Sequence, residues 1–167
     1  MGKFHNLVNF TKRYKAEKHS FYMDVASWKK FTSPIALNWT RIAFGEATRT
    51  QVPTVRGLYV FTVVAPTLGL PEHGYILYVG ETGNTGGATL RFRYGQYLAN
   101  LNNEDGRPAV FYMMDNWKDD LFFNFVPVPD ATIDVKAIQN SFIDALIPPV
   151  NKRDIDAKIA AGKAADF

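Results

Sequence analysis

Cysteine is absent from the 167 residues of this chain. The chain therefore has no disulfide, no thiol nucleophile and no cysteine-ligated zinc, which fits an intracellular protein. A long apolar run is also missing, because the stretch Leu58–Val64 is soon followed by Pro66, Gly69 and Pro71 and falls short of the roughly 20 residues of a membrane span. The amino terminus lacks the apolar stretch of a secretory signal. We expect one cytoplasmic domain with no membrane contact.

Charge is present in both signs but is unevenly distributed. Residues 1–56 hold ten basic and three acidic side chains, residues 57–98 hold two of each, and residues 99–167 hold seven basic and eleven acidic. Because basic side chains neutralise phosphates and release counterions, the basic segment predicts a polyanionic partner. A solvated surface explains the same charge at least as simply. The candidate nucleic-acid contacts are Lys12, Arg13, Lys15, Lys29, Lys30, Arg41 and, later in the chain, Arg91.

Hydrophobic periodicity and turn residues predict an α+β domain with a small, mainly antiparallel sheet of about three core strands flanked by helices. Residues 1–56 are expected to form a basic helical arm for DNA binding or dimerisation, residues 57–151 the core and residues 152–167 a tail. A helix is one interpretation of the ambiguous segment Pro108–Trp117, and Pro66–Gly74 predicts a hairpin loop. The expected strands are Gly57–Ala65, Tyr75–Glu81 and Leu121–Val128, and the expected helices are Leu7–Lys18, Asp24–Phe31 (capped by Asp24), Leu90–Leu101 and Asp134–Leu146.

Two features of the sequence that often indicate nucleotide or metal binding do not indicate either here. The glycine-dense turn Gly80–Gly87 lacks the Gly-Lys-Ser/Thr ending of a phosphate-binding loop, so we expect no nucleotide cofactor. The three histidines, His5, His19 and His73, have no metal-ligand spacing and are best interpreted as solvated side chains.

Five short motifs between residues 57 and 151 point instead to phosphate chemistry. Cleavage of a phosphodiester needs a base for water, cations for the phosphorane oxygens and a proton source for the leaving oxygen. Two tyrosines on neighbouring strands can serve as the base and the acid only if nearby positive charge lowers their pKa from about 10. Arg93 and a metal ion would supply that charge. The alternative is that the tyrosines pack the sheet and Arg93 is a surface cation. The motifs are Gly57-Leu58-Tyr59, Tyr78-Val79-Gly80, Leu90-Arg91-Phe92-Arg93 with Tyr97 one turn later, Gln139-Asn140-Ser141-Phe142-Ile143, and Pro148 with Asn151.

In this order and spacing the motifs resemble those of the GIY-YIG nuclease family, with Leu58 and Val79 standing where the family has isoleucine. The resemblance covers about residues 57–151 and is greatest to the compact GIY-YIG type II restriction endonucleases. It implies that Tyr59 is the general base, that Arg93 binds the scissile phosphate, that Tyr78 and Tyr97 orient water, phosphate or each other, and that Asn151 braces the site by hydrogen bonds.

The chain departs from the family at the metal position. The family holds one divalent ion, usually magnesium, with a glutamate, and counting back from Pro148–Asn151 places Gln139 there. A neutral amide is a poor ligand for a hard cation, and the helix neighbours Val135, Lys136, Phe142 and Ile143 offer no carboxylate. We expect Mg²⁺ or Mn²⁺ to bind weakly or not at all, and cleavage to be slow or absent. Gln139 is either an engineered change that traps the substrate or the mark of a natural protein that only binds.

The leading interpretation is a site-specific endonuclease acting on double-stranded DNA, most like a restriction enzyme, which leaves a 5′-phosphate and a 3′-hydroxyl. A palindromic target calls for a homodimer with one active site per strand. Three alternatives stay open: a non-catalytic DNA-binding pseudo-nuclease, a nuclease directed at RNA or single strands, and a plain structural protein.

Overall fold

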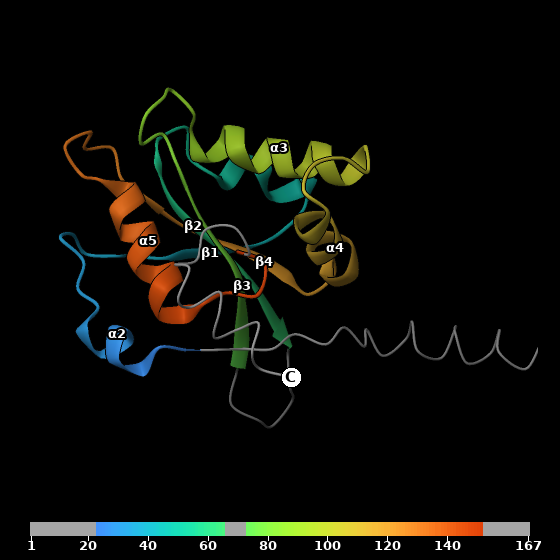
Figure 1. Ribbon diagram of the computed structural model, residues 1–167. Coiled ribbons are helices and arrows are strands. Elements are labelled where there is room, and N and C mark those ends of the chain that lie inside the picture. The colour runs from blue at the N-terminus through green and yellow to red at the C-terminus, as the bar shows by residue number, and fades with distance from the viewer. Residues whose placement is uncertain (1–22, 66–72, 152–167) are drawn as a thin grey trace, which may run out of the picture.

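The computed structural model describes residues 23–65 and 73–151 (Figure 1). The expected helix Leu7–Lys18, the candidate contacts Lys12, Arg13 and Lys15, most of the loop Pro66–Gly74, and the tail 152–167 lie outside these residues.

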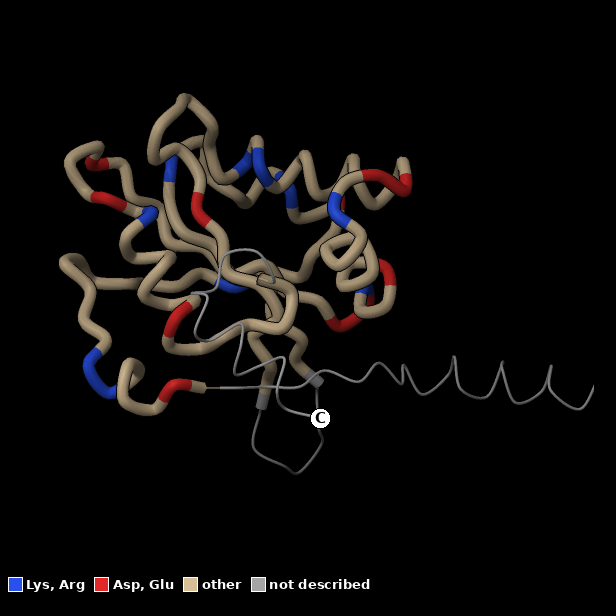
Figure 2. The backbone as a smooth tube through the Cα atoms, in the orientation of Figure 1, with Lys and Arg blue, Asp and Glu red and all other residues tan. Residues whose placement is uncertain are grey.

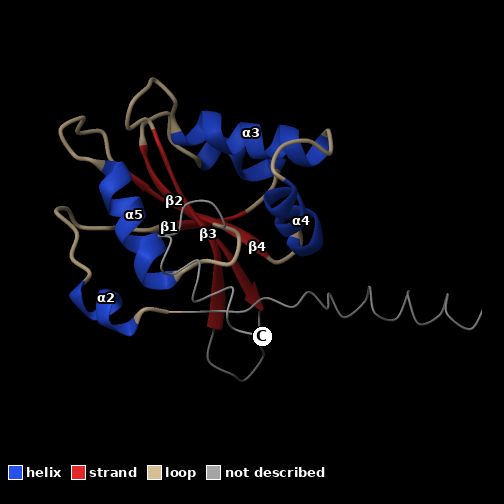
Figure 3. Ribbon diagram, viewed as in Figure 1, coloured by secondary structure: helices blue, strands red, loops and turns tan. Residues whose placement is uncertain are grey.

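Four antiparallel strands form the central sheet, as Figure 3 shows in red. They are β1 (Thr40–Ala43), β2 (Gly57–Ala65), β3 (His73–Thr82) and β4 (Leu121–Pro127), in the spatial order β1-β4-β2-β3. The prediction of a small antiparallel sheet flanked by helices is confirmed. Strand β1 was not predicted, because four residues are too few for an alternating pattern to be recognised. It forms because Ile42 pairs with Phe123 and is buried beside it.

Helices cover both faces of the sheet (Figure 1). One face carries α3 (Leu90–Asn102) and α4 (Pro108–Trp117), whose buried side chains join those of Phe61 and Phe123 in one hydrophobic core. The other face carries α5 (Val135–Leu146), with α2 (Val25–Lys30) packed against it. The ambiguous segment 108–117 is thus a helix, with Pro108 at a position where a missing N–H costs nothing.

Side-chain caps fix where the helices begin. Asp24 accepts hydrogen bonds from the backbone amides of Ala26 and Ser27, which confirms its predicted capping role. Asp134 caps α5 in the same way through Ala137. The C-terminal end of α5 is set by Ile147, whose φ of 45° is left-handed and stops the helix before Pro148.

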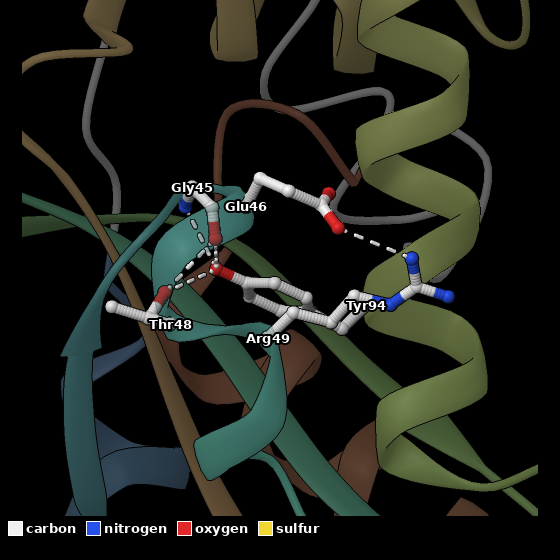
Figure 4. Close-up of polar contacts among 5 residues, drawn as sticks. All are labelled: Gly45, Glu46, Thr48, Arg49 and Tyr94. Atoms are coloured by element: carbon white, nitrogen blue, oxygen red, sulfur yellow. Dashed lines mark hydrogen bonds and ion pairs between the residues drawn. The ribbon is translucent and has the colours of Figure 1, made fainter.

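The chain before residue 57 is joined to the core through Tyr94 of α3 (Figure 4). The Tyr94 hydroxyl accepts from the Gly45 amide at 2.7 Å, lies 2.8 Å from the Gly45 carbonyl oxygen and 2.8 Å from the Thr48 hydroxyl. These bonds hold the short 3₁₀ helix η1 (Glu46–Gln51) against α3. Residues 23–56 are therefore continuous with the core and contribute strand β1 to its sheet.

No helix within residues 23–65 and 73–151 has both the length and the apolar character that crossing a bilayer requires.

Candidate functional site

Three tyrosines from β2, β3 and α3 meet on the face of the sheet covered by α3 and α4. In the β2–β3 pairing Tyr78 lies opposite Phe61, and Tyr59 lies opposite Gly80. The ring centroid of Tyr59 is 6.2 Å from that of Tyr78 and 5.8 Å from that of Tyr97. The hydroxyls of Tyr59 and Tyr97 are 2.8 Å apart and hydrogen-bonded. Three of the residues singled out in the sequence are thus brought together by strand pairing and helix packing.

Gly80 makes room for the first of these tyrosines. A Cβ placed on Gly80 would lie 2.5 Å from Cε2 of Tyr59 and would overlap its Cζ and hydroxyl oxygen as well. The Tyr59 ring is only 2% exposed and stacks on Phe123, so it has little space in which to move away. The glycine of the Tyr78-Val79-Gly80 motif is therefore a steric requirement for the position of Tyr59.

Arg107, which the sequence did not single out, contacts the second tyrosine. Its guanidinium Nη2 donates to the Tyr78 hydroxyl at 2.6 Å, and its Cζ lies 5.2 Å from the centre of the Tyr78 ring. Arg107 is the residue before α4 and is distant in sequence from every motif. Only the packing of α4 against the sheet places it beside Tyr78, so no local signal could have identified it.

Arg93 and Arg107 line the same pocket, a hollow of about 320 Å³ between α3 and the start of α4. Figure 2 shows basic positions in blue along α3 and in the loop that leads into α4. Arg93 donates to Gln96 Oε1 at 2.8 Å, while its buried Nε has no hydrogen-bond partner among the described residues. Such a pocket suits an anion, because its lining carries two guanidinium groups and no carboxylate: Arg93, Gln96, Tyr97, Ala99, Asn100, Gly106, Arg107 and Val110.

Burial raises the pKa of two hydroxyls of the cluster, those of Tyr59 and Tyr97. Desolvation, followed by the neighbouring Tyr97 and Tyr78, raises the pKa of Tyr59 well above its ordinary value, and the opposing charge of Arg93 has the smallest effect. Desolvation likewise raises the pKa of Tyr97, although Arg107 opposes it. For Tyr59, Arg93 alone does not supply the positive charge needed to lower the pKa from about 10, because the cost of burying a phenolate is larger than the attraction of the arginine.

Gln139 of α5 and Asn151, which follows α5, lie against β3, an edge strand of the sheet. The amide of Asn151 accepts from Val79 N and donates to Val79 O, both at 2.9 Å, and thus pairs with the backbone as a neighbouring strand would. Gln139 Nε2 also donates to Val79 O, at 3.2 Å. Both side chains are buried, so they fix the backbone of the residue between Tyr78 and Gly80.

The side-chain oxygen of Gln139 accepts a hydrogen bond from a lysine of the same chain. Oε1 accepts from Lys136 Nζ at 2.8 Å, one helical turn away on α5. No group of three or more histidine or acidic side chains suited to a metal ion occurs in the described part of the chain. A neutral amide whose oxygen is paired with an ammonium group does not fit a hard divalent ion, and the donor set therefore disagrees with the magnesium site that the resemblance implies.

The remaining candidate nucleic-acid contacts have different surroundings. Lys29 and Lys30 are exposed in the last turn of α2, and exposed Arg41 on β1 lies over the ring of Phe122 at 5.2 Å. Arg91 donates to Val52 O at 2.6 Å and to Thr50 O at 2.9 Å. The Arg91 guanidinium thus holds the connection between η1 and β2, a structural task that its sequence position did not predict.

No family model, no curated protein and no solved structure matches this chain, so the resemblance to GIY-YIG nucleases rests on the sequence motifs alone.

Proposed function

We propose that this protein is a DNA endonuclease of the GIY-YIG type whose cleavage step is impaired by Gln139. The observation that carries the proposal is the meeting of Tyr59, Tyr78 and Tyr97 beside a pocket lined by Arg93 and Arg107. Two guanidinium groups and one tyrosine, Tyr97, line one hollow, and such groups can hold a phosphodiester and donate to its oxygens.

In this proposal a phosphate of the DNA backbone enters the pocket and is bound by the two arginines. Tyr97, which lines the pocket, donates to the phosphate or to water. The Tyr97 hydroxyl also holds the Tyr59 hydroxyl in place through their 2.8 Å hydrogen bond. Arg107 holds the Tyr78 hydroxyl at 2.6 Å. For Tyr59 to take a proton from water, it must first become a phenolate, and burial opposes that step because it raises the pKa. Binding is therefore expected to be effective and hydrolysis slow or absent.

A non-catalytic DNA-binding protein is the second candidate, and one contact favours it. The bond between Lys136 and Gln139 Oε1 occupies the oxygen that a catalytic ion would use. Both candidates predict salt-sensitive binding of duplex DNA, since both depend on phosphate contacts. They differ in what happens when a carboxylate is restored.

Plasmid DNA incubated with Mg²⁺ and the double variant Gln139→Glu with Lys136→Met, which restores the carboxylate and removes the ammonium group paired with that position, tests the enzymatic proposal. Discrete bands that disappear on a further Arg93→Ala substitution are expected for a site-specific endonuclease, whereas the matched variant Lys118→Ala, an exposed cation at the end of α4, should leave them unchanged. Intact plasmid together with specific duplex binding would select the non-catalytic candidate. Parallel digests of single-stranded DNA and RNA decide between duplex and single-strand substrates.

A palindromic target further predicts a homodimer on DNA. Light scattering of the protein alone and with a duplex that carries the target site measures the number of protomers. One protomer per duplex would contradict the homodimer.

A further inference from the structure

Lys136 and Gln139 form an ammonium–amide pair on α5 next to the backbone of Val79. Lys136 Nζ donates to Gln139 Oε1 at 2.8 Å, and Gln139 Nε2 donates to Val79 O at 3.2 Å. Gln139 is 4% exposed, whereas Lys136 is partly exposed. The ammonium group is therefore held by a buried acceptor while its side chain still reaches the surface, where an anion can approach it.

A second cation, Arg56, is linked to this pair through Asn84. Asn84 Oδ1 accepts from Arg56 Nη2 at 3.3 Å and from the backbone amide of Lys136 at 3.5 Å. Two carboxylates lie near this network: Glu81 Oε2 accepts from the Asn84 amide at 3.4 Å, and the Asp130 carboxylate interacts with Arg56. Glu81 accepts from the Asn84 amide and Asp130 accepts from Thr132, so both carboxylates are engaged, and the ammonium group of Lys136 repels a divalent ion at Gln139.

We propose that the ammonium group of Lys136 takes the place of the divalent ion at this position, so that the protein holds a nucleic-acid phosphate here without a metal. The phosphate part of this inference rests on the proposed function. The exclusion of the metal rests only on the donor set and the neighbouring charges.

The pair also determines what a restored glutamate would do. In the variant Gln139→Glu, Lys136 lies where it can pair with the new carboxylate, and one carboxylate oxygen faces the Val79 carbonyl oxygen instead of donating to it. The ion pair would compete with Mg²⁺ for the same oxygens. Restoring the carboxylate alone is therefore expected to restore little metal binding, and removal of Lys136 is needed as well.

A Mn²⁺ titration without nucleic acid, followed by water-proton relaxation, tests the metal part. The expected order is no binding by the unmodified protein, little binding by Gln139→Glu, and binding about tenfold tighter in Gln139→Glu with Lys136→Met. The matched control pairs Gln139→Glu with Lys118→Met and should behave like Gln139→Glu alone. Saturable binding to the unmodified protein at this site, or a double variant no better than Gln139→Glu, would overturn the inference.

Duplex binding at several salt concentrations in EDTA tests the phosphate part. The unmodified protein should bind equally well in EDTA and in Mg²⁺ at matched ionic strength. Lys136→Met should reduce the slope of log K against log salt by about 0.9, the value of one phosphate contact, while Lys136→Arg and Lys118→Met retain it. An unchanged slope in Lys136→Met, or binding that requires Mg²⁺, contradicts the proposal. A protein that binds no duplex refutes the proposed function and the phosphate part together, and the Mn²⁺ titration still decides the metal part.

Discussion

The variant Gly80→Ala tests the packing on which the tyrosine cluster depends. The new methyl group would overlap the ring end of Tyr59, and the ring is enclosed by Phe123, Tyr78 and Tyr97. Overpacking of a filled core costs about 1–3 kcal/mol, and displacement of Tyr59 from Tyr97 loses a buried hydrogen bond of about 1 kcal/mol. We expect the free energy of unfolding to fall by about 3 kcal/mol, which is a decrease in Tm of about 9 °C for a chain of this size.

Urea and thermal unfolding, with tyrosine circular dichroism as the probe, measure this effect. Gly86→Ala is the matched control, because a Cβ on Gly86 meets no atom within 4 Å. If Gly80→Ala and Gly86→Ala unfold within about 0.5 kcal/mol of each other, Tyr59 can move freely and the steric role of Gly80 is refuted.

Three further predictions concern the same region. Asn151→Ala should lower the free energy of unfolding by about 2 kcal/mol, measured in urea, because the buried N–H of Val79 loses its acceptor, while Val79 O keeps the hydrogen bond from Gln139; a loss below about 1 kcal/mol would contradict this. Tyr97→Phe should cost about 1–2 kcal/mol, since the Tyr59 hydroxyl loses its hydrogen bond, and an unchanged urea midpoint would refute the prediction. Because the pKa of Tyr59 is raised in the folded protein, the unfolded chain releases this phenolic proton near pH 10 and the folded chain releases it only at higher pH. The stability contributed by the protonated Tyr59 is therefore complete below about pH 10 and falls as the pH rises above it. Urea midpoints on both sides of about pH 10 check the sign, and a midpoint that rises with pH would reverse it.

Much of the fold could be predicted from local patterns. The strand Gly57–Ala65 is predicted with the same bounds that the structure has, and Asp24 and Pro148 mark a helix start and a helix end where capping rules place them. Strand β1 could not be predicted, since its pairing of Ile42 with Phe123 is a contact between distant segments. Local signals in its four residues are too weak to distinguish a strand from a loop.

The candidate site divides in the same way. The motifs identify Tyr59, Tyr78 and Tyr97, and the four-residue spacing of Arg93 and Tyr97 places both on α3. No pattern indicates that Arg107 holds the hydroxyl of Tyr78, or that Arg91 is occupied by backbone carbonyls.

The order of strands and helices, the glycine beside the tyrosine motif and the missing carboxylate at residue 139 are properties of the sequence itself, because backbone preference and side-chain chemistry act within a few residues. The tertiary structure alone determines which charged groups lie close together and which hydroxyls are buried away from water. Burial raises the pKa of Tyr59, and the packing of the chain brings Arg107 to Tyr78. Desolvation and distant contacts depend on how the whole chain packs, and such packing leaves no trace in a short stretch of residues.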